Sequence, residues 1–162
     1  TESAFRRSVS PYLLKEYNKR WFLIGFDHAE QRVHTFPLDR ILDWASDPLT
    51  HFYRHPLFVP DNWYRHVYGV SMPHDPLPEE ILLEVTQHRK QYMLSKPLHP
   101  TQELVSETDG HALFRFHLII NFEWEQLILS YADDMRVCKP ASLASRLQER
   151  LANALHQYVG VG

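Results

Sequence analysis

Cationic side chains and aromatic rings occur close together near the start of the chain. Arg32 and His34 lie on one face of a strand-like segment, and Arg40 follows shortly after it. Trp21 and Phe22 belong to the preceding segment, which a hairpin would place alongside. Guanidinium groups beside aromatic rings bind base-containing anions through bidentate hydrogen bonds and stacking. The candidate residues for binding an anionic effector are therefore Arg7, Trp21, Phe22, Arg32, His34 and Arg40.

The same residues also allow an interpretation without a ligand. A basic strand is often simply solvated, and Asp39 next to Arg40 predicts a local ion pair of little energetic weight. The residue pattern alone does not separate these two interpretations.

The eleven histidines raise the question of a metal site, but their spacing does not support one. His51 and His55 are close in sequence, with His66 and His74 further along. Zinc sites need a compact set of ligands, and the chain has no H-E-x-x-H motif and no second cysteine beside Cys138. We therefore expect no metal and no cofactor.

Motifs for catalysis are missing as well. No G-x-S-x-G elbow occurs, and none of the five glycines stands in a G-x-G-x-x-G or P-loop spacing. Cys138 lies in a predicted strand without an implied partner, so we expect a buried structural cysteine. The paired acids fall at element boundaries, where carboxylates favour turns and helix starts. The sequence therefore predicts a protein without enzymatic activity.

The elements that must position the candidate residues fall into three stretches. Residues 1–45 read as short strands, with a hairpin connection at 27–31. Residues 46–78 form a connecting segment rich in proline and aromatic side chains, in which Asp61 or Asn62 is expected to cap a short helix. Residues 79–162 show the clearest periodicity and form the third stretch.

That third stretch predicts the order β-α-β-β-α-β followed by a final helix. Apolar residues alternate from Ile81 to Val85 and again over 112–120, as in half-buried strands. Asn121 is a favourable cap for the second helix, and leucines repeat every helical turn in the last one. The order is that of ferredoxin-like domains. The chain is thus expected to be α+β.

Composition narrows the class of protein further. With a formal net charge of -3, the chain lacks the global basic surface that is typical of a free-standing nucleic-acid binder. The single cysteine, together with the absence of a signal-peptide pattern and of a bilayer-spanning apolar run, favours the cytoplasm over secretion or a membrane. Because the chain begins at Thr1 without an initiator methionine, we expect a fragment of a longer protein.

Several motifs resemble the WYL-domain family of transcriptional regulators. Ser10-Pro11-Tyr12, Arg20-Trp21-Phe22-Leu23 and His34-Thr35-Phe36-Pro37-Leu38-Asp39-Arg40-Ile41 follow the order and spacing of its P-x-x-L, W-Y-L and R-x-F-x-L-D-R-I motifs. The second half, including Val137-Cys138-Lys139-Pro140, is similar to the extension that often follows this domain. The resemblance covers nearly the whole chain.

The resemblance implies a partial Sm-like or SH3-type β-barrel in residues 1–45, followed by the ferredoxin-like extension. It further implies a ligand-sensing role, with a nucleotide or single-stranded nucleic acid as the anionic effector. A homodimer is expected, with DNA bound only by a helix-turn-helix domain N-terminal to this chain. The alternative is a dimerisation or interaction module that binds no ligand.

Two positions depart from the family's pattern. Phe22 replaces the usual tyrosine and so lacks its hydroxyl group. His34 replaces a permanently charged residue with one that titrates near neutral pH. Anion binding is therefore expected to be weaker than in relatives, or to depend on pH.

Overall fold

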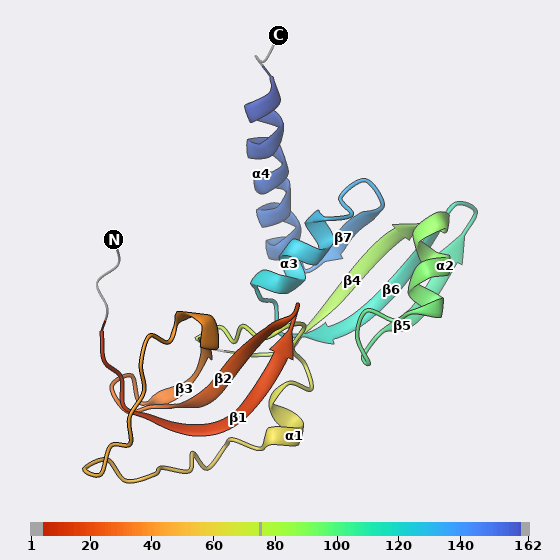
Figure 1. Ribbon diagram of the computed structural model, residues 1–162. Coiled ribbons are helices and arrows are strands. Elements are labelled where there is room, and N and C mark those ends of the chain that lie inside the picture. The colour runs from red at the N-terminus through yellow and green to blue at the C-terminus, as the bar shows by residue number, and fades with distance from the viewer. Residues whose placement is uncertain (1–4, 75, 160–162) are drawn as a thin grey trace. The chain divides into compact units, whose positions relative to one another are not determined.

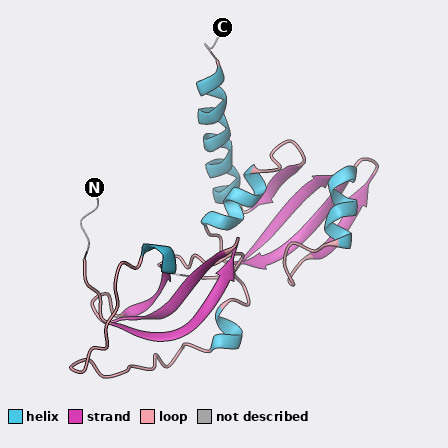
Figure 2. Cartoon of the chain, viewed as in Figure 1, coloured by secondary structure: helices cyan, strands magenta, loops and turns pink. Residues whose placement is uncertain are grey.

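The computed structural model describes residues 5–74 and 76–159, and the chain divides into two compact units (Figure 1). Unit 1 contains the chain up to Arg65 together with Gly69–Met72. Unit 2 contains His66–Tyr68 together with the chain from Pro73 onward. Figure 2 shows mostly strand and loop in unit 1 and a mixture of strands and helices in unit 2. The predicted α+β class is confirmed by these antiparallel sheets and their helices.

Unit 1 is built on a three-stranded antiparallel sheet. Asn18 and Lys19, which join the first two strands, have φ values of 50° and 62°, so the chain turns back within two residues. An open sheet of three strands does not close a barrel, so the barrel stays a prediction. The strands, in their order across the sheet, are β1 (Val9–Tyr17), β2 (Arg20–Asp27) and β3 (Arg32–Pro37), and a short 3-10 helix, η1 (Leu38–Arg40), follows.

The connecting segment covers one face of this sheet. Phe22 and Ile24 of β2 are buried against Phe58 and Val70 of that segment. The segment also carries the short helix α1 (Pro60–Trp63). These contacts form the hydrophobic core of unit 1 and leave the opposite face of the sheet without this cover.

The expected cap of the short helix is wrong. Val59 is the N-cap residue and Pro60 occupies the first helical turn, so the helix begins before Asp61 and Asn62. Proline is favoured at this position because its missing N–H would have no partner inside the helix.

Unit 2 has the element order expected from the sequence. Its sheet is antiparallel throughout, with strand order β5-β6-β4-β7, which is the arrangement of a split β-α-β fold. The elements are β4 (Glu79–Thr86), α2 (Gln87–Ser95), β5 (Glu103–Thr108), β6 (His111–Leu118), α3 (Phe122–Leu129), β7 (Met135–Lys139) and α4 (Ala141–Tyr158).

One face of the unit 2 sheet carries its core. Alternate residues of β4 and β6 are fully buried, and Trp124 of α3, which is 0% exposed, packs in the same cluster. Asn121 caps α3 as predicted, because its side chain accepts a 2.9 Å hydrogen bond from the backbone N–H of Trp124. The cap and the apolar stripe together fix where α3 begins and which side faces the sheet.

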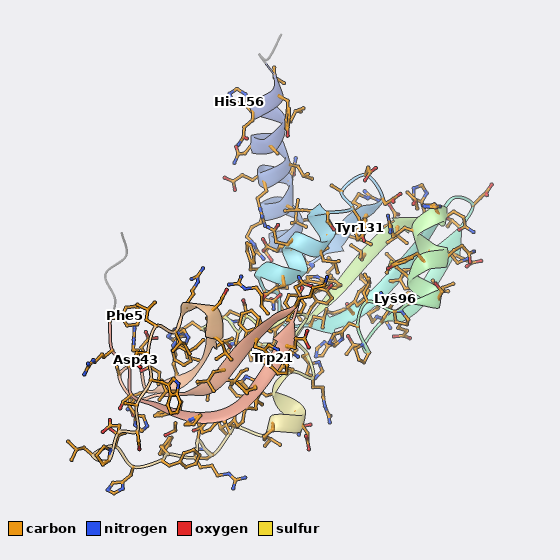
Figure 3. All side chains as sticks on the ribbon, in the orientation of Figure 1. Phe5, Trp21, Asp43, Lys96, Tyr131 and His156 are labelled. Carbon is orange, nitrogen blue, oxygen red and sulfur yellow. The ribbon has the colours of Figure 1, made fainter. Side chains whose placement is uncertain are left out.

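Only the first half of α4 contributes buried side chains to the core of unit 2. Leu143 and Leu147 belong to the core of unit 2, whereas Leu151 is 42% and Leu155 65% exposed. The exposed leucines border an apolar groove of about 620 Å³ between α4, α3 and β7. Figure 3 shows the side chains along this helix up to His156 near its end. Within the described residues, no helix is long and apolar enough to cross a membrane.

The expected burial of Cys138 is wrong, because this cysteine is exposed. Side chains alternate between the two faces of a strand, and the neighbouring Val137 points into the core. Cys138 therefore lies on the open face of the sheet.

Candidate anion-binding site

The candidate cations of β3 lie on the face of the unit 1 sheet opposite its core. The strand register pairs Gly25 with His34 and Asp27 with Arg32. Directly paired residues of neighbouring strands share a face, and residues two apart along a strand do so as well. Phe36 therefore lies on this same face beside His34, and their rings are 5.4 Å apart.

Three basic side chains converge on one carboxylate at the end of this face. Glu30 Oε1 forms an ion pair with Arg7 Nη1 at 2.9 Å, and Oε2 accepts a 3.0 Å hydrogen bond from Arg32 Nε. His34 Nε2 lies 3.2 Å from the same Oε2 atom. All four side chains are partly exposed, between 29% and 36%. We call Arg7, Glu30, Arg32 and His34 the Glu30 cluster.

The turn between β2 and β3 holds Glu30 in place through Asp27. The Asp27 carboxylate is 1% exposed and accepts hydrogen bonds from the backbone N–H groups of Ala29 at 2.8 Å and Glu30 at 3.2 Å. Its second oxygen accepts from Arg7 Nη1 at 3.0 Å. Arg7 thus bridges the buried acid of the turn and the partly exposed acid of the cluster.

The charges of the Glu30 cluster and of Asp27 determine how strongly the site attracts an anion. The hydrogen bond from Arg32, with further contributions from the charges of His34 and Arg7, lowers the pKa of Glu30. Glu30 therefore stays ionised throughout the neutral range. The guanidinium groups of Arg7 and Arg32 face the carboxylates of Asp27 and Glu30, so these four charges balance and a proton on the His34 imidazole adds one unbalanced positive charge.

The remaining candidate residues lie elsewhere in unit 1. Trp21, labelled in Figure 3, is 50% exposed near the opposite end of β2. Arg40 is exposed in η1 and has no ion-pair partner in the described part of the chain. Phe22 is 9% exposed and belongs to the core on the other face. The structure brings together Arg7, Arg32 and His34, but not the other three.

Sequence reasoning missed two residues of this region. Glu30 was grouped with the polar turn, although its position four residues before His34 and two before Arg32 is a usable signal for ion pairing. Phe36 appeared only within the family motif, yet its ring lies 5.4 Å from that of His34.

Two family models match the chain. Residues 1–46 match the WYL domain, and residues 77–155 match the WCX domain. Every member of the Glu30 cluster lies within the first match. Only residues 47–76 and 156–162 remain outside both matches. No curated protein matches the chain.

Among solved structures, the chain is similar to proteasome accessory factor B/C (PafBC) of Arthrobacter aurescens. The two share 18% sequence identity, with a TM-score of 0.40. The similarity covers 90% of this chain and 22% of the other. The chain thus spans less than a quarter of the length of that protein.

Proposed function

The chain belongs to the WYL-domain family, with a WCX domain after the WYL domain, and we propose that it is the effector-sensing, non-catalytic part of a bacterial transcriptional regulator. In this proposal an anionic effector binds unit 1, and a DNA-binding domain outside this chain responds in the cytoplasm. The effector shifts the regulator between states of different operator affinity.

The observation that carries this proposal is the convergence of Arg7, Arg32 and His34 on one point of a partly exposed sheet face. Two guanidinium groups and an imidazole meet there, and the imidazole lies beside the ring of Phe36. Guanidinium groups suit the oxygens of phosphates, and an aromatic ring next to them suits a nucleobase. A nucleotide or a single-stranded nucleic acid is therefore the proposed class of effector.

One serine–histidine contact in unit 1 has the residue types of a catalytic pair. Ser10 Oγ lies 2.9 Å from His28 Nε2. However, Ser10 is 2% exposed, and its Oγ already accepts a hydrogen bond from the backbone N–H of Tyr53. A nucleophile must reach its substrate, so this pair supports a structural role and a non-catalytic chain.

Replacing Arg32 tests the site directly. We expect Arg32→Ala to weaken binding of a short single-stranded oligothymidylate by at least about tenfold, because it removes a charge-assisted donor. Fluorescence anisotropy titration at low salt measures this effect. Arg54→Ala removes the same charge from the connecting segment of unit 1 and serves as control, while Arg40→Ala tests the other end of the sheet. If wild-type protein shows no saturable binding of oligothymidylate or nucleotides, the proposed function is wrong.

Binding should also depend on pH through His34. Histidine in general gains its proton as the pH falls from about 8 to 5. Glu30 has a lowered pKa and stays ionised in this window, and Arg7 and Arg32 keep their charges. The added proton strengthens attraction for an anion, so affinity should rise as the pH falls. His34→Gln should flatten the pH profile, and a wild-type affinity that does not change with pH would contradict this assignment.

A second candidate function is dimerisation without a ligand. It is favoured by the exposed half of α4, where Leu151 and Leu155 border the apolar groove. A second copy of the chain would cover this surface. Light scattering combined with ligand screening separates the two candidates, since this second one requires a tight dimer and no ligand that raises the melting temperature.

A further inference from the structure

We infer that Glu30 is an internal occupant of the effector's oxyanion position, which the effector must displace to bind. This inference rests on the proposed function and adds to it how the site selects its ligand. It assigns the position to a phosphate group, with Arg7, Arg32 and His34 as its donors.

The Glu30 carboxylate uses the donors that a bound phosphate would use. Oε1 forms an ion pair with Arg7, which precedes β1, and Oε2 accepts a hydrogen bond from Arg32 Nε and lies 3.0 Å from Arg32 Nη2. Two segments far apart in sequence thus direct guanidinium N–H groups at one oxyanion. Phosphate oxygens are acceptors of the same kind and form charge-assisted hydrogen bonds with guanidinium groups.

His34 can act as a switch within this arrangement. Its Nε2 atom lies 2.7 Å from Arg32 Nη2 and 3.2 Å from the Glu30 carboxylate. A neutral Nε2 without a proton accepts from Arg32, whereas a protonated Nε2 donates to the oxyanion. The proton on His34 therefore adds a third donor to whichever oxyanion occupies the position.

Glu30 can leave the position without unfolding the turn. The turn backbone is fixed by the buried carboxylate of Asp27, which holds the N–H groups of Ala29 and Glu30. The Glu30 side chain itself is 34% exposed, and within the described residues its carboxylate contacts the three basic side chains. Rotation of one side chain into solvent therefore frees the donors while the hairpin stays intact.

A tethered carboxylate filters ligands by charge. Because Glu30 is attached to the same chain, it competes for the three basic side chains at a high effective concentration. The concentration of a free monocarboxylate rarely exceeds this value. A phosphate group carries more charge, and a nucleotide gains further contact with the ring of Phe36 beside His34. The site should consequently accept phosphate-bearing ligands and reject simple carboxylates.

The test compares Glu30→Gln with wild type, using oligothymidylate, inorganic phosphate and acetate as probes. We expect Glu30→Gln to bind the oligothymidylate about tenfold more tightly, since the weak ion pairs of the Glu30 carboxylate no longer have to be broken before the ligand binds. Glu16→Gln removes the same charge from an exposed position on β1 and should leave affinity unchanged. Adding Arg32→Ala to Glu30→Gln should cancel the gain. Acetate should compete with the oligothymidylate only in Glu30→Gln, and inorganic phosphate in both proteins.

Each other outcome has a defined meaning. If wild type binds oligothymidylate and Glu30→Gln binds it equally or more weakly, the inference is overturned while the proposed function stands. An equal gain in Glu16→Gln would show a nonspecific charge effect and would also overturn the inference. If neither wild type nor Glu30→Gln binds any of the phosphate-bearing probes, the proposed function fails and the inference with it.

Discussion

Trp124→Ala is expected to lower the free energy of unfolding of unit 2 by about 3–5 kcal/mol. Trp124 is 0% exposed, and its ring lies 4.9 Å from that of Phe116 and 5.7 Å from that of Tyr68. Removing the indole leaves a cavity in the centre of the core. Urea denaturation followed by far-ultraviolet circular dichroism measures the loss.

Two variants control this prediction. Trp44 is 86% exposed, so Trp44→Ala should change stability by less than about 0.5 kcal/mol. Trp124→Phe keeps most of the packed ring and gives up an indole N–H that has no acceptor in the described structure, so its loss should be well below that of alanine. Equal midpoints for Trp124→Ala and Trp44→Ala would contradict the assignment of Trp124 to the core. Because the two units have separate cores, oligothymidylate binding by unit 1 should persist in Trp124→Ala.

The sequence was most informative where a local signal and a periodicity coincide. The helix α3 begins after Asn121, as predicted, because the cap side chain and the apolar stripe are both encoded within a few residues. The strands β4 and β6 were likewise predicted from alternation, since each has one face in the core and one outside. Such features depend only on neighbours in the chain.

The sequence was least informative where a side chain's role depends on what packs against it. The leucine stripe of α4 predicts an apolar face along the whole helix, but the core reaches only Leu143 and Leu147. Trp21 and Phe22 were grouped as one aromatic surface, yet adjacent strand residues point to opposite faces, and the connecting segment covers only that of Phe22. Which face is covered is set by a segment distant in sequence.

The candidate site illustrates the same limit. The cations of β3 were predictable because alternation places Arg32 and His34 on one face. Their partner Glu30 was less predictable, because its spacing indicates ion pairing in general, whereas the direction of a side chain on a turn follows from the turn's own hydrogen bonds. Here those bonds come from the buried Asp27, so the fold of the hairpin decides the electrostatics of the site.

Asp27→Ala should therefore reduce the free energy of unfolding of unit 1 by about 1–3 kcal/mol, the range for hydrogen-bonding groups left without an acceptor. The substitution removes the acceptor of the backbone N–H groups of Ala29 and Glu30. It also removes the acceptor of the hydrogen bond from Arg7 Nη1. Asp27 is 1% exposed, so water does not readily replace the lost carboxylate. Urea denaturation monitored by circular dichroism reports the change.

Asp27→Asn separates the two functions of this carboxylate. The amide oxygen can still accept from the turn N–H groups, whereas the charge facing Arg7 is gone, so the loss should lie clearly below that of Asp27→Ala. Asp39, which pairs with Arg20 and is 56% exposed, gives the matched control, and Asp39→Ala should cost less than about 1 kcal/mol. Equal losses for Asp27→Ala and Asp39→Ala would show that the turn is held by something other than its buried carboxylate. The position of Glu30 beside Arg32 and His34 would then need a different explanation, because the conformation of the turn places the Glu30 side chain next to them.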